Sequence, residues 1–353
     1  MVPTLIRDAP IRVIEEVVVA GGGESRHRAW PSAERAPSGD LVVAYRSGDD
    51  HHLTDQGTLY ITRSQDGGRT WPITRPLASE PGWGTYTNHG MTSLSDGTML
   101  LHVIRGQNHG PRRESMYARA RYTRSRDGGI TWEPYGPVLD FPFLSPDERG
   151  FPYGGIQELT EDRLMVPFYG IPKGATDLNQ RILAVIFSND RGETWDDYSL
   201  IYAEDSGDIC PSEADIIRLD DGRFLAVARA NAAGLLYRCT SDDEGSTWTS
   251  LEPTSMPGQC PSLLRLNSGD LLCAYRETTE GQPGMSCAVS RDDGSTWDAL
   301  GSLYHGSNWD CAYPSLVRST GTQIFCAFYT SAEQVGDGLD CEIRGLLLED
   351  VSG

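Results

Sequence analysis

The sequence predicts an all-β protein, a β-propeller of six four-stranded antiparallel blades. An eight-residue box recurs five times along the chain, and six similar pairs of short apolar runs flank tight turns. No segment shows the 3.6-residue apolar periodicity that is typical of an amphipathic helix. Repeats near 50 residues long that consist of short strands and turns are typical of propeller blades.

The recurrent box has the consensus Ser-x-Asp-x-Gly-x-Thr-Trp. Its successive starts lie 61, 63, 53 and 49 residues apart. We expect each box to form a turn in which Asp caps the backbone, Gly adopts a positive φ and Trp packs between blades. The spacing lacks the ligand series of an EF-hand, which favours a structural turn over a calcium site. The five copies are residues 64–71, 125–132, 188–195, 241–248 and 290–297.

Each repeat is expected to begin with a hairpin of two strands, followed by a third strand, the box and a fourth strand. The sixth blade has no box, and we expect its third strand at residues 341–348. Ile11–Ala20 would supply its fourth strand, which closes the ring and removes the open sheet edges. No linker interrupts the pattern, so residues 1–353 are predicted to form a single domain. The six hairpins are residues 30–46, 88–105, 153–169, 213–229, 260–276 and 313–329.

The amino-acid composition indicates which classes of binding partner and which cellular compartment to expect. The net charge of −20 argues against nucleic acid or an anionic membrane as a partner. Charges interrupt the N-terminal segment, which is therefore unlike a signal peptide, and no run of 18 apolar residues predicts a membrane span. Eight cysteines without a C-x-x-C pair indicate free core thiols and a reducing, cytoplasmic location; a trimmed secreted chain is the alternative. The sequence predicts no cofactor or metal and does not indicate the oligomeric state.

The functional face is expected where first strands start and second strands end, because antiparallel neighbours meet there. Core strand ends are normally apolar, yet these positions carry a glutamate, several aromatic residues and three arginines. The pattern predicts either a ligand site on the axis or a polar plug that fills the channel. The first-strand starts are Trp30, Asn88, Tyr153, Glu213, Cys260 and Tyr313, and the arginines that end second strands are Arg46, Arg229 and Arg276.

The boxes resemble those of the sialidase (neuraminidase) superfamily of six-bladed propellers, over residues 30–350. Residues 212–219 together with Arg229 look like the blade in which sialidases keep a glutamate and one arginine of their carboxylate-binding triad. The stretch Ala-Tyr-Pro-Ser-Leu at 312–316 looks like the segment around their catalytic tyrosine. The resemblance implies that Tyr313 is the nucleophile, that Glu213 takes its proton and that Arg229 binds a carboxylate.

Two departures from the family pattern bear on the substrate. Sialidases begin the first blade with Arg-Ile-Pro, whereas this chain has Ala29 at the position of that arginine. Residues 281–285, where the third arginine is expected, contain none. Sialic acid itself is therefore disfavoured. Arg46 and Arg276 share the register of Arg229 and would rebuild the clamp around another anion, unless Glu213 and loop carboxylates are their partners.

The family's acid/base aspartate follows the second strand of the first blade, at residues 47–55 here. Asp50 is the expected acid/base, with Asp55 as the alternative. His52 would share the role because imidazole titrates near neutral pH. A His-His-Asp cluster formed by His51, His52 and a loop aspartate would alternatively hold a metal. Trp30, His89 and Tyr153 are further substrate-binding candidates.

Together these features predict an exo-acting retaining glycoside hydrolase that removes a terminal acidic or modified sugar. A polysaccharide lyase on the same scaffold, with Tyr313 or His52 as its acid/base, is one alternative. A non-catalytic glycan-binding propeller is the other, because the fold does not by itself determine the chemistry.

Overall fold

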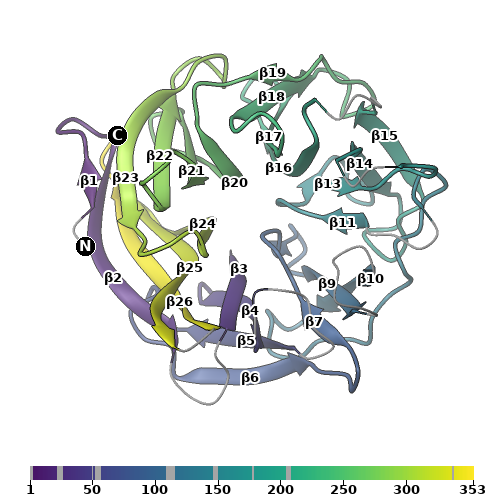
Figure 1. The fold of residues 1–353 in the computed structure, drawn as a ribbon, viewed down its shortest axis with the longest axis horizontal. Coiled ribbons are helices and arrows are strands. Elements are labelled where there is room, and N and C mark those ends of the chain that lie inside the picture. The colour runs from purple at the N-terminus through teal and green to yellow at the C-terminus, as the bar shows by residue number, and fades with distance from the viewer. Residues whose placement is uncertain are drawn as a thin grey trace.

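The structure, a computed structural model, describes residues 3–21, 27–49, 51, 57–108, 116–145, 150–176, 179–203, 208–335 and 338–353. The described residues form β-strands and no helix. In this part of the chain, accordingly, there is no helix of the length and apolarity needed to cross a membrane. The sheets follow one another in chain order round a ring (Figure 1). The all-β class that the sequence predicts is confirmed.

The largest sheet has eight strands and joins the two ends of the chain. Its order is β24-β25-β26-β3-β4-β5-β6, and β2 pairs with β26. Strand β2 runs along the outside of the ring next to β26 (Figure 1), with Ile11 opposite Asp350. The strands are β2 (Ile11–Ala20), β3 (His27–Arg35), β4 (Leu41–Gly48), β5 (Thr58–Ser64), β6 (Ile73–Ala78), β24 (Cys311–Thr320), β25 (Gln323–Val335) and β26 (Gly338–Asp350).

The other four sheets follow the second to fifth repeats. The second repeat forms β7 (Gly84–Tyr86), β8 (Thr92–Ser93), β9 (Met99–Asn108) and β10 (Met116–Ser125). The third forms β11 (Gly150–Pro152), β12 (Gln157–Glu158), β13 (Leu164–Gly170), β14 (Ile182–Ser188) and β15 (Asp197–Tyr202). The fourth forms β16 (Pro211–Arg218), β17 (Phe224–Ala230), β18 (Leu236–Ser241) and β19 (Glu252–Pro253). The fifth forms β20 (Gly258–Arg265), β21 (Leu271–Glu277), β22 (Gly284–Ser290) and β23 (Asp298–His305), to which β1 (Thr4–Leu5) adds.

The described strands form five sheets, whereas the sequence predicts six separate blades. The strands expected for the first and last blades belong to one sheet because Cys341 of β26 pairs in parallel with His27 of β3. That parallel contact is one residue pair long, while β3 and β4 pair along most of their length. A single backbone bridge therefore accounts for the difference in sheet number.

All five boxes form the same hydrogen-bonded turn. In the fourth box, the Ser241 hydroxyl donates to Asp243 Oδ1 (2.9 Å) and accepts from the Gly245 amide (2.9 Å). Asp243 also accepts from the Thr247 amide (2.8 Å) and the Thr247 hydroxyl (2.6 Å). The corresponding bonds recur in the other four boxes. The polar groups of each box thus hydrogen-bond to one another and form a turn, as predicted from the residue types.

The box glycine also packs one sheet on the preceding one. Gly245 has a φ of +81°, and a Cβ there would lie 2.3 Å from Met165 Sδ of the third sheet. Gly294, with a φ of +79°, meets Leu225 of the fourth sheet at the same 2.3 Å. Glycine is required for both its conformation and its size. A box tryptophan makes a similar contact where Trp195 stacks on Tyr122 of the second sheet (4.9 Å between centroids).

The inner edge of the ring is closed by hydrogen bonds between consecutive segments. The bonds join a side chain or carbonyl of one segment to a backbone amide of its neighbour, and the last segment returns to the first. The donors and acceptors are Met91 N to Ser32 Oγ (2.7 Å), Gly154 N to His89 O (2.9 Å), Gly155 N to Asp215 Oδ1 (3.1 Å), Leu263 N to Asp215 Oδ2 (2.8 Å), Leu316 N to Ser262 Oγ (3.0 Å) and Ala33 N to Ser315 Oγ (2.9 Å).

We predict that the box aspartates make the fold sensitive to acid. Hydrogen bonds from Thr70 lower the pKa of Asp66 from its ordinary 3.8 to about 2. For Asp127, hydrogen bonds from Thr131 outweigh the opposing effect of burial and also lower the pKa to about 2. A depressed carboxyl pKa stabilises the fold above the unfolded value and loses that effect as the pH falls through the folded value. The melting temperature should therefore fall between about pH 4 and about pH 2.

Thermal unfolding of the double variant Asp66→Asn, Asp127→Asn, followed by circular dichroism, tests this. Its melting temperature should depend less on pH in that window than that of the wild type. Asp242→Asn, at a variable position of the fourth box, is the matched control and should keep the wild-type slope. Parallel slopes for the wild type and the double variant would contradict the prediction.

Candidate active site

Four inner strands carry an irregularity at the same place. The pairing of β3, β16, β20 and β24 with the next strand shifts register between Ala29 and Ser32, Ser212 and Ala214, Gln259 and Ser262, and Ala312 and Ser315. Each bulge contains a non-glycine residue with a positive φ, a conformation that costs about 1–3 kcal/mol per residue. These residues are Trp30 (φ 54°), Glu213 (40°), Cys260 (55°) and Tyr313 (50°), and Ala312 next to Tyr313 also has a positive φ (74°).

The bulges bring side chains from three sheets together. The Tyr313 hydroxyl donates to Glu213 Oε1 at 2.7 Å, and the Cys260 thiol lies 3.1 Å from Glu213 Oε2. Arg229, at the end of β17, donates to Glu213 Oε2 (2.8 Å) and to the Tyr313 oxygen (3.4 Å). Tyr313, Glu213 and Cys260 are buried, and Arg229 is nearly so. The structure therefore brings together the predicted nucleophile, its base and one arginine.

The electrostatics define the resting protonation states. Burial alone would raise the pKa of Glu213, but the charge and hydrogen bonds of Arg229 outweigh it and leave the pKa below its usual value. Burial, with the nearby Cys260 and Glu213, raises the pKa of Tyr313 well above its usual value. Burial also raises the pKa of Cys260 to about 12. At neutral pH the site therefore holds a phenol, a thiol and a carboxylate paired with a guanidinium.

Arg276 lies on the other side of Tyr313. Its guanidinium carbon is 4.6 Å from the centre of the Tyr313 ring, which is a cation–π contact. Its Nε donates to the carbonyl of Cys311 and its Nη2 donates to the Tyr329 hydroxyl, both at 2.8 Å. Both hydrogen-bond partners are uncharged, and among the described residues no carboxylate oxygen lies within 4.0 Å of this guanidinium.

Arg46, the third predicted arginine, is placed differently. It is fully buried, and its guanidinium carbon lies 5.4 Å from the centre of the Trp30 ring. Two glycines make room for it, because a Cβ at Gly48 would lie 2.5 Å from its Nη2 and one at Gly57 would lie 2.9 Å from its Nε. The contacts described here place Arg46 against Trp30, while Arg229 and Arg276 flank Tyr313.

His89 and Tyr153 lie deeper in the ring. His89 bonds to Ser315 Oγ through Nδ1 (2.8 Å) and to Asp215 Oδ2 through Nε2 (3.2 Å). Both partners belong to the ring-closing hydrogen bonds, so His89 has a structural role. The Tyr153 ring lies 5.7 Å from that of His89 and is fully buried. Burial raises the pKa of Tyr153 well above its usual value.

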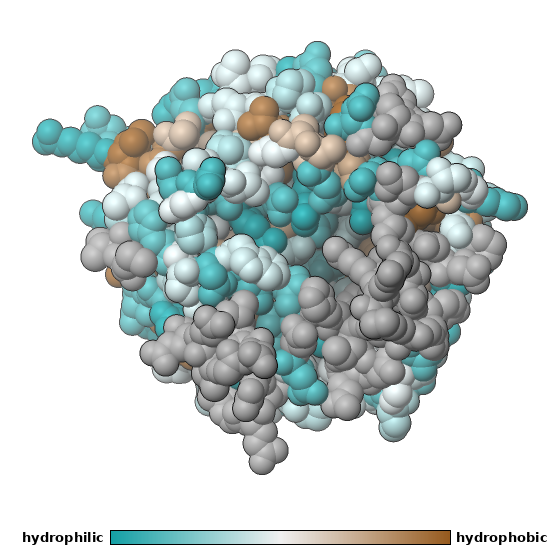
Figure 2. Space-filling view, viewed as in Figure 1, coloured by the Kyte–Doolittle hydropathy of each residue, from teal (hydrophilic) through white to brown (hydrophobic). Residues whose placement is uncertain are grey.

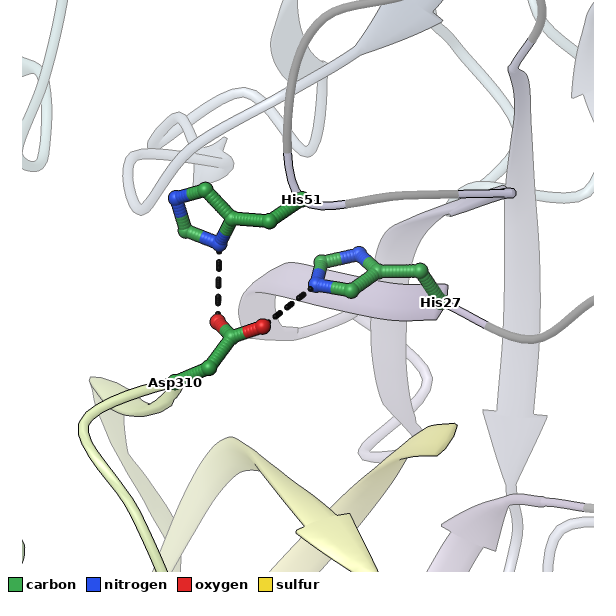
Figure 3. Close-up of side chains that lie close together, drawn as sticks. All are labelled: His27, His51 and Asp310. Atoms are coloured by element: carbon green, nitrogen blue, oxygen red, sulfur yellow. Dashed lines mark hydrogen bonds and ion pairs between the residues drawn. The ribbon is translucent and has the colours of Figure 1, made fainter. Parts of the chain in front are cut away.

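Asp50, Asp55 and His52, the predicted loop residues, lie outside the described residues. The neighbouring His51 is described, and its Nδ1 lies 2.8 Å from Asp310 Oδ1 (Figure 3). His27 Nε2 lies 3.0 Å from the other oxygen of Asp310. The sequence pattern indicates the loop but not this cluster. The only local signal is that Asp310 precedes Tyr313 by three residues.

The three ligand atoms of His27, His51 and Asp310 lie within 4.8 Å of one another, as in a metal site. Each imidazole, however, faces a different oxygen of the carboxylate, and the Tyr329 hydroxyl also donates to Asp310 Oδ1 (2.7 Å). These contacts form a hydrogen-bond network in which Asp310 is the common acceptor. Within the described residues, the buried Nδ1 of His27 has no hydrogen-bond partner.

A separate cavity of about 430 Å³ lies beside this loop. It is lined by residues 47–49, 57–58 and 79–83, including Trp83, whose ring is 4.4 Å from the guanidinium carbon of Arg105. None of the predicted site residues that the structure describes lines it. Figure 2 shows hydrophilic side chains round a hollow near the middle of this face of the ring.

A family model described as a BNR repeat-like domain matches residues 39–326. The comparison with curated proteins returned no match. Among solved structures, a protein of unknown function from Dyadobacter fermentans is 22% identical with a TM-score of 0.82, and the match covers 97% of this chain and 99% of that one. A Hadza microbial sialidase is 20% identical (TM-score 0.71; 91% of this chain, 65% of that one). A Penicillium chrysogenum α-L-arabinanase complexed with arabinobiose is 13% identical (TM-score 0.69; 96% and 98%).

We predict that Arg229→Gln destabilises the fold more at neutral than at acidic pH. Removing one partner of a buried ion pair costs about 3–5 kcal/mol of unfolding free energy. Without Arg229, burial raises the pKa of Glu213, and a raised carboxyl pKa lowers stability as the pH rises. Urea unfolding at about pH 7 should show the larger loss, and unfolding at about pH 5 the smaller.

Arg238→Gln is the matched control for this measurement. Arg238 pairs with Glu252 at 2.8 Å, but that carboxylate side chain is 62% exposed. The loss there should stay under about 1 kcal/mol at both pH values. Equal losses for Arg229→Gln at the two pH values would show that Glu213 is not the charge that Arg229 compensates.

Proposed function

The chain belongs to the BNR repeat-like domain family, and from this premise we propose that it is a retaining exo-glycosidase acting on a terminal acidic or modified sugar. The observation that carries the proposal is the 2.7 Å hydrogen bond from the buried Tyr313 hydroxyl to Glu213. A phenol paired with a carboxylate is the arrangement that makes tyrosine a nucleophile. The scaffold is glycosidase-like, since solved structures of a sialidase and an arabinanase share it.

In the first step of the proposed reaction, the Tyr313 oxygen attacks the anomeric carbon and Glu213 takes the phenolic proton. The depressed pKa of Glu213 makes it a weak base, so the proton moves in concert with the attack. Arg229, 3.4 Å from the phenolic oxygen, and Arg276, over the ring, stabilise the negative charge that develops on Tyr313. Water then releases the sugar from tyrosine with the anomeric configuration retained.

The surroundings of Arg276 support the proposal that the substrate is an acidic sugar. It is a buried cation whose hydrogen bonds go to uncharged partners, and such a cation favours an anion nearby. A carboxylate on the sugar would supply that charge through paired hydrogen bonds. Arg229 already compensates Glu213, which leaves Arg276 as the first arginine for the substrate.

For the scaffold, we propose six blades in a single domain that spans the chain. The six ring-closing hydrogen-bond junctions support this number, since each links one inner segment to the next. On this interpretation β24, β25, β26 and β2 are the sixth blade, and the pairing of β2 with β26 closes it.

We predict that Tyr313→Phe abolishes turnover without unfolding the protein. The assay measures phenol release from 4-nitrophenyl α- and β-glycosides of glucuronic and galacturonic acid and from 4-methylumbelliferyl glycosides of sialic and ulosonic acids. Loss of the nucleophile should lower kcat by about 10³-fold or more. Glu213→Gln should lower it by about 10²–10⁴-fold, because the phenol keeps its proton.

Tyr237→Phe, on β18, is the matched control and should keep wild-type activity. NMR of the first-formed product of the wild type should show the retained anomer, and mass spectrometry should detect a fluorosugar adduct on Tyr313. An inverted anomer, or full activity of Tyr313→Phe, contradicts the assignment. An unsaturated product from a 1,4-linked polyuronide, whose O4 carries the leaving group that elimination needs, would instead identify a lyase. Saturable binding of the glycosides without any product would identify a glycan-binding protein.

A further inference from the structure

A second group of titratable side chains lies next to the Tyr313–Glu213 pair and has no part in the steps above. Asp310 immediately precedes β24, and His51 follows β4, 259 residues away in the chain. Asp310 is fully buried and accepts hydrogen bonds from His27, from the Tyr329 hydroxyl and from His51. Connecting segments from the two ends of the chain therefore meet at one carboxylate.

The two histidines of this group differ in exposure. The His27 side chain is 1% exposed, whereas that of His51 is 24% exposed. The His51 ring lies 5.0 Å from the ring of Trp309, which is 60% exposed, and 5.5 Å from that of Trp30. Figure 3 shows the second ring nitrogen of His51 pointing away from Asp310. The partly exposed His51 ring thus contacts the Asp310 carboxylate through one nitrogen and lies near the indole rings of Trp309 and Trp30.

The tautomer of His51 follows from its hydrogen bond. Burial would raise the pKa of Asp310, but the hydrogen bonds from His27 and His51 outweigh it and keep the pKa far below its usual range. Asp310 is thus an ionised acceptor, and the Nδ1 of His51 that faces it carries a proton. The nitrogen that gains or loses a proton during a reaction is then Nε2.

A chain of contacts connects His51 to the predicted nucleophile. Asp310 Oδ1 accepts from the Tyr329 hydroxyl at 2.7 Å, and that hydroxyl accepts from Arg276 at 2.8 Å. Arg276 lies over the Tyr313 ring, and the Tyr313 and Tyr329 rings are 6.0 Å apart. The His51–Asp310 pair is therefore connected to the Tyr313–Glu213 pair through Tyr329 and Arg276.

We propose that His51 is the general acid/base of the glycosidase and that Asp310 positions its imidazole, an inference that rests on the proposed function. In the first step the bond between the anomeric carbon and the leaving oxygen breaks, and that oxygen takes a proton from Nε2 of the His51 imidazolium. In the second step Nε2 takes a proton from water as the water oxygen bonds to the anomeric carbon. The sugar–tyrosine bond breaks in the same step, as the bond to water forms, and the phenolic oxygen recovers its proton from Glu213.

The test compares leaving groups, because only a poor leaving group needs the acid. The probes are the methyl, 4-nitrophenyl and 2,4-dinitrophenyl glycosides of the sugar that the wild type hydrolyses fastest in the panel above. His51→Gln should lower the rate of glycosyl–enzyme formation from the methyl glycoside by about 10²–10⁴-fold, and by less than about tenfold from the 2,4-dinitrophenyl glycoside. His305→Gln, which alters a histidine bonded to Thr4, is the matched control and should behave as the wild type.

Azide provides the second arm of the test. Azide attacks the glycosyl–enzyme without base assistance, so His51→Ala with the 2,4-dinitrophenyl glycoside should be accelerated and should give the glycosyl azide of retained configuration. Tyr313→Phe should not be accelerated. An equal fall in rate for all three glycosides, with no azide product, would overturn the role of His51. It would not contradict the assignment of Tyr313 as the nucleophile. No turnover of any glycoside by the wild type would overturn the proposed function and this role with it.

The positioning role of Asp310 is tested by a measurement that a loss of stability alone would not change. Nitrogen-15 NMR of the imidazole rings should show the Nδ1–H tautomer for His51 in the wild type and the Nε2–H tautomer in Asp310→Asn. An unchanged tautomer would contradict the positioning role. Zinc titration by calorimetry tests the metal alternative: stoichiometric Zn²⁺ binding that disappears in His51→Gln and that turnover requires would overturn the acid/base assignment.

Discussion

The bulge at the start of four inner strands is the constraint on which both the ring and its site depend. At each of these bulges a residue has a positive φ, and the residue two positions later bonds to a neighbouring inner segment. Glu213 followed by Asp215 and Tyr313 followed by Ser315 are the two instances that the proposed function uses. The strained conformation persists because the ring-closing hydrogen bonds over-determine it. The same bulges therefore close the ring and position the side chains of the candidate site.

Arg229 has two effects that oppose each other. It keeps Glu213 ionised in a buried position, and it thereby weakens Glu213 as a base for Tyr313. The balance changes when charge develops on the phenolic oxygen, because Arg229 and Arg276 both lie close to it. Fixed cations in a water-poor site stabilise that charge more than they would in water. In the proposed reaction, the site thus favours proton transfer and attack that occur together over a start from a free phenolate.

Register within the repeats made much of the site predictable from the sequence. Glu213 and Tyr313 are 100 residues apart, yet their equal positions in two hairpins predict that both project from the starts of inner strands, and they are in contact. The His51–Asp310 pair was not predictable in this way, because both residues lie in connections that share no register. Arg46 shows a further limit: its strand position matches that of Arg229, but the room left by Gly48 and Gly57 places its guanidinium against Trp30. The sheet count depended on one bridge between His27 and Cys341, which no strand pattern encodes.

This division between strands and connections has a consequence for the chemistry. The strands hold Tyr313, Glu213 and both flanking arginines, so these groups are fixed by the same hydrogen bonds that close the ring. The proposed acid/base pair comes from connecting segments and is linked to Tyr313 through Tyr329 and Arg276. Residue types in connections change with less effect on packing than residues in strands. A scaffold of this kind can therefore keep a tyrosine–glutamate pair while the proton donor changes from a carboxyl group to an imidazole.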